Sequence, residues 1–276
     1  MKIVTLLENT TEREDLATGH GLSLYIETTK HKILFDMGPN DKFIGNAEKL
    51  GVDLKAVDIA VLSHGHYDHG GGLGAFCRLN DQAKIYIHKD AFGPYYAQKK
   101  DFSLRYIGLD PAFREFEDRF IYTEGDTRID DELTLISNVE DKMHALRASS
   151  KLKIKAEDGT LTQDTFVHEQ NLLITDMGRV VLIAGCAHKG IANIIEAVYP
   201  LVHQEPHVVF GGFHFFELDP EDQEDNDLIM LTGLAVQLTR TAFYTGHCTG
   251  DYAYERLEKL LQDRLHPMRG GTTFEF

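Results

Sequence analysis

The sequence predicts an α/β fold with mixed β-sheets, and three observations support this prediction. Short apolar or β-branched runs recur along the chain and end in Gly, Asp, Ser or His. Some neighbouring runs are separated by so few residues that only a hairpin can join them. Helical patterns separate the later runs. The expected strands are 21–28, 31–38, 57–64, 84–89, 170–175, 179–186, 207–214 and 241–248.

Three helices are expected in the second half of the chain. Residues 189–202 repeat Ile and Val at three- and four-residue spacing, 226–240 open with an Asn–Asp capping signal, and 251–265 carry a leucine stripe. These apolar stripes predict ordinary packing against a core. Hairpins are expected within 21–38 and 170–186, so the sheets contain antiparallel parts.

The composition indicates a cytoplasmic protein with free thiols. The chain has 276 residues, 42% of them hydrophobic, which is enough to bury a substantial core. Its formal net charge of −16 opposes attraction to phosphate backbones, so no nucleic-acid partner is expected. No signal-peptide pattern and no membrane-spanning apolar run is found, and three cysteines are too few for a disulfide scaffold. The oligomeric state is left open.

One domain over residues 1–276 is expected, and residues 90–165 differ in composition from the rest of it. This region is aromatic and charged, with weaker strand signals. It is either an inserted lid over a site or a peripheral subdomain. Its cations Lys99, Lys100 and Arg105 are either ligands of an anionic substrate or ordinary surface charge.

The stretch "VLSHGHYDHGGG" (61–72) places three histidines and an aspartate within six positions at the end of an expected strand. In an extended backbone, residues two apart face the same side, so His64 and His66 can face one ion. Asp68 and His69 follow the turn and can face a second ion. Neutral imidazole and carboxylate are ligands that Zn²⁺, Fe²⁺ and Mn²⁺ accept. The cluster therefore predicts a site for two divalent metal ions.

This H-x-H-x-D-H pattern resembles the hallmark of the metallo-β-lactamase superfamily, and later motifs in the expected order extend the resemblance over nearly the whole chain. The resemblance implies a four-layer αββα sandwich, in which two mixed β-sheets are flanked by helices. It also implies a dinuclear metal site at the edge that the two sheets share. Asp36, in "ILFDMG", matches an aspartate that orients a ligand histidine without binding metal itself.

The resemblance further implies metal ligands far from the first motif. His168 precedes the second hairpin, and Cys186 ends it where superfamily members supply a bridging acidic residue. Either the Cys186 thiolate replaces that carboxylate as a softer ligand, or His188 takes over the task. His247, in "YTGHCTG", matches the final histidine ligand.

Three short motifs, "GCAHKGI", "GGFHFF" and "GHCTGD", resemble one branch of the superfamily. That branch is named for 7,8-dihydropterin-6-yl-methyl-4-(β-D-ribofuranosyl)aminobenzene 5′-phosphate synthase. The resemblance makes His214, in the second motif, a candidate to donate a hydrogen bond to a substrate oxyanion or to bind metal. Asp68 and His214 are the candidate catalytic residues.

These residues predict a metal-dependent hydrolase that acts through a metal-bridging hydroxide. We expect two divalent ions, zinc first with iron or manganese as alternatives, and a small, anionic phosphate- or ester-containing substrate. The alternative within the same fold is the pterin-dependent synthase reaction. An alternative of another class is a catalytically silent metal- or ligand-binding sensor.

Overall fold

The computed structural model describes residues 1–276 and divides the chain into two compact units. Unit 1 comprises Met1–Glu124, Lys151–Gln170 and Arg269–Phe276, and unit 2 comprises Gly125–Ser150 and Asn171–Met268. Each unit contains a seven-stranded sheet, and a four-stranded sheet is also present. None of the helices combines the length and the apolar character that a membrane span requires. The expected organisation as one domain stays a prediction.

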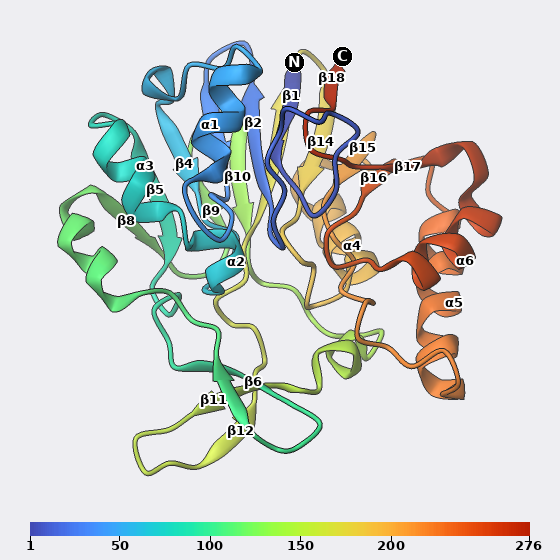
Figure 1. Ribbon diagram of the computed structural model, residues 1–276. Coiled ribbons are helices and arrows are strands. Elements are labelled where there is room, and N and C mark those ends of the chain that lie inside the picture. The colour runs from blue at the N-terminus through green and yellow to red at the C-terminus, as the bar shows by residue number, and fades with distance from the viewer. The chain divides into compact units, whose positions relative to one another are not determined.

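The seven-stranded sheet of unit 1 has the order β18-β1-β2-β3-β4-β5-β8 (Figure 1). Its pairs are antiparallel from β18 to β3 and parallel from β3 to β8. The strands of unit 1 are β1 (Lys2–Leu7), β2 (Ser23–Glu27), β3 (Lys32–Phe35), β4 (Ile59–Val61), β5 (Lys84–His88), β6 (Tyr95–Gln98), β7 (Leu104–Tyr106), β8 (Phe120–Thr123), β11 (Leu152–Lys155), β12 (Leu161–Gln163) and β18 (Thr273–Glu275). Its helices are α1 (Lys42–Lys49), α2 (Tyr67–Gly70) and α3 (Leu73–Leu79), with 3₁₀ helices at Leu54–Ala56 and Pro111–Arg119.

Apolar side chains of α1 and α3 pack against this sheet. Phe43 and Ala47 of α1 and Phe76 of α3 are buried in one cluster with Val4, Leu34 and other strand residues. Burying a phenylalanine side chain contributes about 1.5–3 kcal/mol. The parallel strands β3 and β4 are thus fixed by core packing. Asp36 follows the carboxyl end of β3, and the histidine motif follows that of β4.

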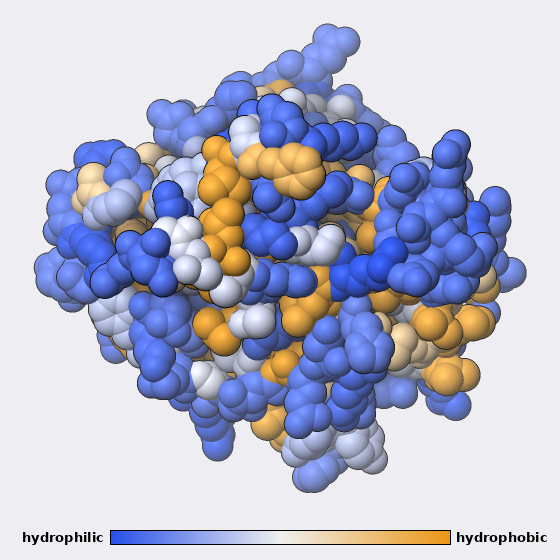
Figure 2. Space-filling model, turned by 90° about the horizontal axis from the view of Figure 1, so that it is seen from below, coloured by the Kyte–Doolittle hydropathy of each residue, from blue (hydrophilic) through white to orange (hydrophobic).

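The four-stranded sheet of unit 1 is antiparallel, with the order β12-β11-β6-β7. All four strands come from the region 90–165. The same region also supplies β8 to the seven-stranded sheet of unit 1, and β9 and β10 to that of unit 2. Figure 2 looks at the molecule from the end at which β6, β11 and β12 lie, and most residues on this face are hydrophilic.

The sheet of unit 2 has the order β17-β16-β15-β14-β13-β10-β9, parallel from β14 to β17 and antiparallel from β9 to β14. Its strands are β9 (Thr127–Arg128), β10 (Leu133–Ile136), β13 (Asn171–Asp176), β14 (Arg179–Ile183), β15 (Val208–Phe210), β16 (Ala242–Thr245) and β17 (Leu265–Pro267). Its helices are α4 (Ile191–Val202), α5 (Gln223–Gln237) and α6 (Asp251–Leu261), with 3₁₀ helices at Ala145–Ser149 and Gln262–Arg264.

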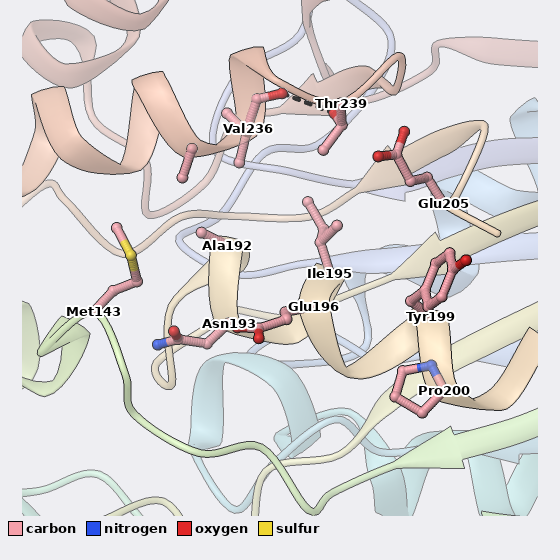
Figure 3. Close-up of a pocket in the computed structure, with 11 residues that line it drawn as sticks. Met143, Ala192, Asn193, Ile195, Glu196, Tyr199, Pro200, Glu205, Val236 and Thr239 are labelled. Carbon is pink, nitrogen blue, oxygen red and sulfur yellow. Dashed lines mark hydrogen bonds between the residues drawn. The ribbon is translucent and has the colours of Figure 1, made fainter. Parts of the chain in front are cut away.

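The core of unit 2 forms where α4, α5 and α6 cover this sheet. Ile191, Ile194 and Val198 of α4 are buried together with Leu228 of α5 and Leu257 of α6. A cavity of about 470 Å³ opens between α4 and α5, as Figure 3 shows. Its lining consists of Met143, Ala192, Asn193, Ile195, Glu196, Tyr199, Pro200, Glu205, Ala235, Val236 and Thr239. None of the predicted site residues lines it.

The structure contains the eight expected strands, the three expected helices and both expected hairpins. The expected strands are too long, however, at the ends that carry site residues. Asp36, His214 and His247 have φ values of 58°, 49° and 51°, which lie in the left-handed region and end an extended strand. His64 lies three residues beyond the end of β4. Asp36, His64, His214 and His247 therefore lie on turns after the strands.

Candidate metal centre

The histidine motif of unit 1 begins in the loop after β4, with His64 and His66, and ends in α2, with Asp68 and His69. The ring centroid of His64 lies 4.6 Å from that of His66 and 4.3 Å from that of His69. Gly65 permits this loop, because a Cβ atom there would lie 2.1 Å from the carbonyl oxygen of Ala91. A tight glycine turn therefore brings the three rings together: the backbone bends at His64 and Gly65, and the expected extended conformation is found at His66.

Asp36 and Ser63 fix the orientation of two of these rings. Asp36 Oδ2 accepts hydrogen bonds from His69 Nδ1 at 2.6 Å and from Ser63 Oγ at 2.8 Å, and Asp36 Oδ1 accepts from the Ser63 N–H at 2.7 Å. Because the Ser63 hydroxyl donates to Asp36, it accepts from His64 Nδ1, 2.8 Å away. Both imidazoles thus carry their proton on Nδ1, which leaves the lone pair on Nε2 for a metal ion.

Asp68 lies beside the rings at the start of α2. Its Oδ2 is 3.7 Å from His69 Nε2 and 3.6 Å from His20 Nε2, and the residue is buried. The carboxylate is therefore placed among imidazole nitrogens, as expected for a ligand or a proton acceptor. His20 was not predicted as a site residue, because it lies far from the motif in sequence and follows no strand.

His168 lies against the same loop, where both of its ring nitrogens are engaged. Its Nδ1 accepts a hydrogen bond from the Gly65 N–H at 2.9 Å, and its Nε2 lies 3.0 Å from Asp164 Oδ2. His66, Asp164 and His168 place their donor atoms within 4.8 Å of one another. His168 in this arrangement positions the loop, and its role as a metal ligand stays a prediction. Asp164 was missed because it lies outside every motif.

Burial controls the charge of these groups. Desolvation, reinforced by the nearby His168, lowers the pKa of His66 to about 3, so this imidazole is neutral at physiological pH. Burial raises the pKa of Asp164, but the hydrogen bond from His168, the nearby imidazoles of His168 and His66, and the hydrogen bond from the Phe166 N–H together outweigh it, so the net pKa lies below the ordinary value. A neutral imidazole beside an ionised carboxylate is suited to binding a cation.

Unit 2 gathers the remaining predicted residues. The donor atoms of Cys186, His188 and His214 lie within 4.8 Å of one another, and Cys186 is equally close to His247. All four residues are buried. The rings of His188 and His214 are 4.1 Å apart, and Ser149 Oγ lies 2.9 Å from His188 Nδ1. The structure therefore brings both Cys186 and His188 into the cluster, so the two alternatives do not exclude each other.

Cys248 is a member of this cluster that the sequence analysis did not single out. Its Sγ donates to the carbonyl of Cys186 at 3.7 Å. Burial raises the pKa of the Cys248 thiol, but the hydrogen bond with Cys186 and the neighbouring His247 and His214 bring the pKa well below its ordinary value. Its place next to His247 in "GHCTG" was the available signal.

The residues of each unit fit a bound metal ion. Unit 1 offers imidazoles with assigned tautomers and a carboxylate, and unit 2 offers a thiol and imidazoles, all of which are ligands for divalent transition metals. The composition of both clusters therefore points to metal binding.

A metal-ligand cluster on turns after parallel strands of an α/β fold is the arrangement of the metallo-β-lactamase superfamily. A family model described as the metallo-beta-lactamase superfamily matches residues 16–142. The chain belongs to this superfamily, whose members typically bind metal ions and are generally enzymes. The expected fold class is confirmed.

Individual relatives indicate the branch of the superfamily that this chain resembles. The chain is 32% identical over 265 residues to uncharacterized protein MJ0448 of Methanocaldococcus jannaschii, with 94% of each chain covered. It is 26% identical over 270 residues to the 7,8-dihydropterin-6-methyl-4-(beta-D-ribofuranosyl)-aminobenzene-5'-phosphate synthase of the same organism, covering 93% of this chain and 90% of that protein. Its fold matches Tm1679, described as a metal-dependent hydrolase of the beta-lactamase superfamily, with a TM-score of 0.82 and 26% identity over 100% of this chain and 99% of that chain. The resemblance to the synthase branch is thus confirmed.

Proposed function

We propose that this protein is a metal-dependent hydrolase that binds two divalent ions, zinc first, and cleaves a small anionic phosphate- or ester-containing metabolite. One observation carries the proposal: the Nδ1 protons of His64 and His69 are held by Ser63 and Asp36, which directs both Nε2 lone pairs to a ligand. Tm1679, which is described as a metal-dependent hydrolase, supports the same reaction class.

The residues of the site have distinct tasks in this proposal. Bound ions would supply an acidified water molecule and would polarise a phosphoryl or acyl oxygen. Asp36 and Ser63 keep the ligand imidazoles in one tautomer. Asp68 is a ligand and a candidate proton acceptor in this proposal, since its Oδ2 lies beside Nε2 of His20 and Nε2 of His69. His214 would donate a hydrogen bond to a substrate oxygen.

The direct test is elemental analysis of the purified protein together with hydrolysis of bis(p-nitrophenyl) phosphate and p-nitrophenyl acetate. We expect bound metal in the parent protein and a loss of metal and turnover in His66→Ala. His31→Ala is the matched control, because His31 lies in the β2–β3 hairpin and pairs with Asp58. Equal metal content in His66→Ala and the parent protein contradicts the assignment.

The second candidate is the synthase reaction, and the 26% identity to the methanopterin-type synthase over 93% of this chain favours it. In that reaction a dihydropterin pyrophosphate is joined to ribofuranosylaminobenzene 5′-phosphate. Incubation with both compounds separates the candidates, because a coupled product supports the synthase and hydrolysis without coupling rejects it. Full metal occupancy without turnover of any of these compounds would instead favour the sensor.

A further inference from the structure

Arg105 stacks on a residue inside the histidine motif. Its guanidinium carbon lies 5.5 Å from the ring centroid of Tyr67. The backbone beside it runs along the motif, since the Tyr67 N–H donates to the Ile107 carbonyl at 2.8 Å and His66 forms an antiparallel bridge with Gly108. The cation is therefore held next to the motif, stacked on the residue that follows His66 in the chain.

The strand that carries Arg105 turns it to the same side as the histidines. Arg105 in β7 lies directly opposite Ala97 in β6. Opposed residues, and residues two apart in one strand, point to the same face of a sheet, so Arg105 shares a face with Tyr95. The Tyr95 ring centroid lies 4.1 Å from that of His168 and 5.8 Å from that of His66.

Arg105 has no acidic partner, unlike comparable arginines of unit 1. Arg78 lies 5.7 Å from the ring centroid of Phe116 and pairs with Glu115 at 3.4 Å. Arg114 also stacks on a ring and pairs with an acid. The contact with Tyr67 is the interaction that the Arg105 guanidinium makes, and the residue is exposed. Its charge is therefore available to an anion.

The sheet around Arg105 is locally positive. Residues 95–106 and 151–163 contain six Lys or Arg and three Asp or Glu, whereas the whole chain has a net charge of −16. Clustered charge of one sign raises the local concentration of ligands of the opposite sign. An anion is therefore attracted to this part of unit 1 despite the acidic balance of the protein.

We propose that Arg105 binds the phosphate group of the substrate, an inference that rests on the proposed hydrolase function. A planar guanidinium presents two parallel N–H donors to two phosphate oxygens. Stacking on Tyr67 fixes the plane of the guanidinium before the ligand binds. Arg105 is thus a specificity residue that favours phosphate-bearing substrates over neutral ones, while the histidine cluster performs the reaction.

The test is a calorimetric titration of the metal-loaded protein with inorganic phosphate, in the parent protein, Arg105→Gln, Arg105→Lys and Arg78→Gln. Metal content is measured on the same samples. Arg105→Gln weakens phosphate binding about tenfold or more, since a charged hydrogen-bond donor is lost. Arg105→Lys has a smaller effect, because it keeps the charge but loses the two parallel N–H donors of the guanidinium. Arg78→Gln leaves phosphate binding unchanged, because Arg78 is already paired with Glu115.

Phosphate affinity of Arg105→Gln within about twofold of the parent, at equal metal content, overturns the proposal. A loss of metal in Arg105→Gln also overturns it, because Arg105 would then support the loop. Tyr67→Leu is a second variant that removes the ring but keeps the charge, and it is expected to weaken phosphate binding as well. A parent protein that binds phosphate through Arg105 but holds no metal contradicts the proposed function, whereas it still supports anion binding by Arg105.

Discussion

Asp36 accepts a 2.6 Å hydrogen bond from Nδ1 of His69, and both side chains are fully buried. The two residues are 33 positions apart in sequence and follow neighbouring parallel strands, β3 and β4. The bond determines which ring nitrogen of His69 carries the proton. The orientation of this imidazole is therefore a property of the sheet rather than of the motif alone.

Replacing Asp36 by Asn should lower metal affinity about 10- to 100-fold, as is typical when the hydrogen-bond partner of a ligand histidine is changed. The amide cannot accept from His69 and Ser63 as the carboxylate does, so the ring loses its assigned tautomer. Competition with a fluorescent zinc chelator measures the change. Glu48→Gln, on the exposed side of α1, is the control. An unchanged affinity in Asp36→Asn would show that Asp36 does not orient a ligand.

The buried His66 predicts that the metal-free protein loses stability on acidification. Its pKa is about 3 in the folded protein and about 6.5 when unfolded, so between these values the unfolded state binds the extra proton. The contribution is fully present above pH 6.5 and is lost as the pH falls toward 3, by up to about 1.4 kcal/mol per pH unit. Urea unfolding at pH 7.5 and 5.0 should show a smaller pH dependence in His66→Gln than in the parent. Equal dependences would contradict the lowered pKa of His66.

Cys186 should act as a thiolate ligand that can be seen by spectroscopy. The cobalt-substituted protein is expected to show sulfur-to-cobalt charge-transfer absorption, which Cys186→Asp removes while it keeps bound metal. Cys77→Ala is the matched control, because Cys77 is buried in the apolar cluster of unit 1 and burial raises the pKa of its thiol to about 11. If the absorption persists in Cys186→Asp and disappears in Cys248→Ala, Cys248 is the ligand.

Two glycines with nearly equal φ angles separate conformational strain from steric clash. Gly190 precedes α4 with φ 87°, and a Cβ there would lie 2.4 Å from the Cβ of Ala145. Gly159 has φ 85° and open space around it. Gly159→Ala should lower the free energy of unfolding by about 1–2 kcal/mol, and Gly190→Ala by about 1–3 kcal/mol more. Chemical denaturation measures both, and equal losses would mean that Ala145 moves aside.

Much of the fold was predictable because its signals are local. Apolar runs and helical stripes identified the eight strands and three helices, since each pattern depends on the faces that one element buries. Strand ends were predicted less well. Whether a strand continues through Asp36 or His214 depends on backbone turns that the packed loops impose. Asp and His adopt positive φ more often than most residues, but this preference is too weak to locate a turn by itself.

The sequence by itself determined the candidate metal ligands, because imidazole and carboxylate side chains spaced as in His64, His66, Asp68 and His69 have few other uses at a turn. Only the tertiary structure decided how those groups are held. Asp36, Ser63 and Asp164 assign tautomers and orient rings, and the strand β7 brings Arg105 against Tyr67. The physical reason is that hydrogen bonds and ring contacts act over a few ångströms, and residues far apart in sequence reach that range only through the packing of the sheets.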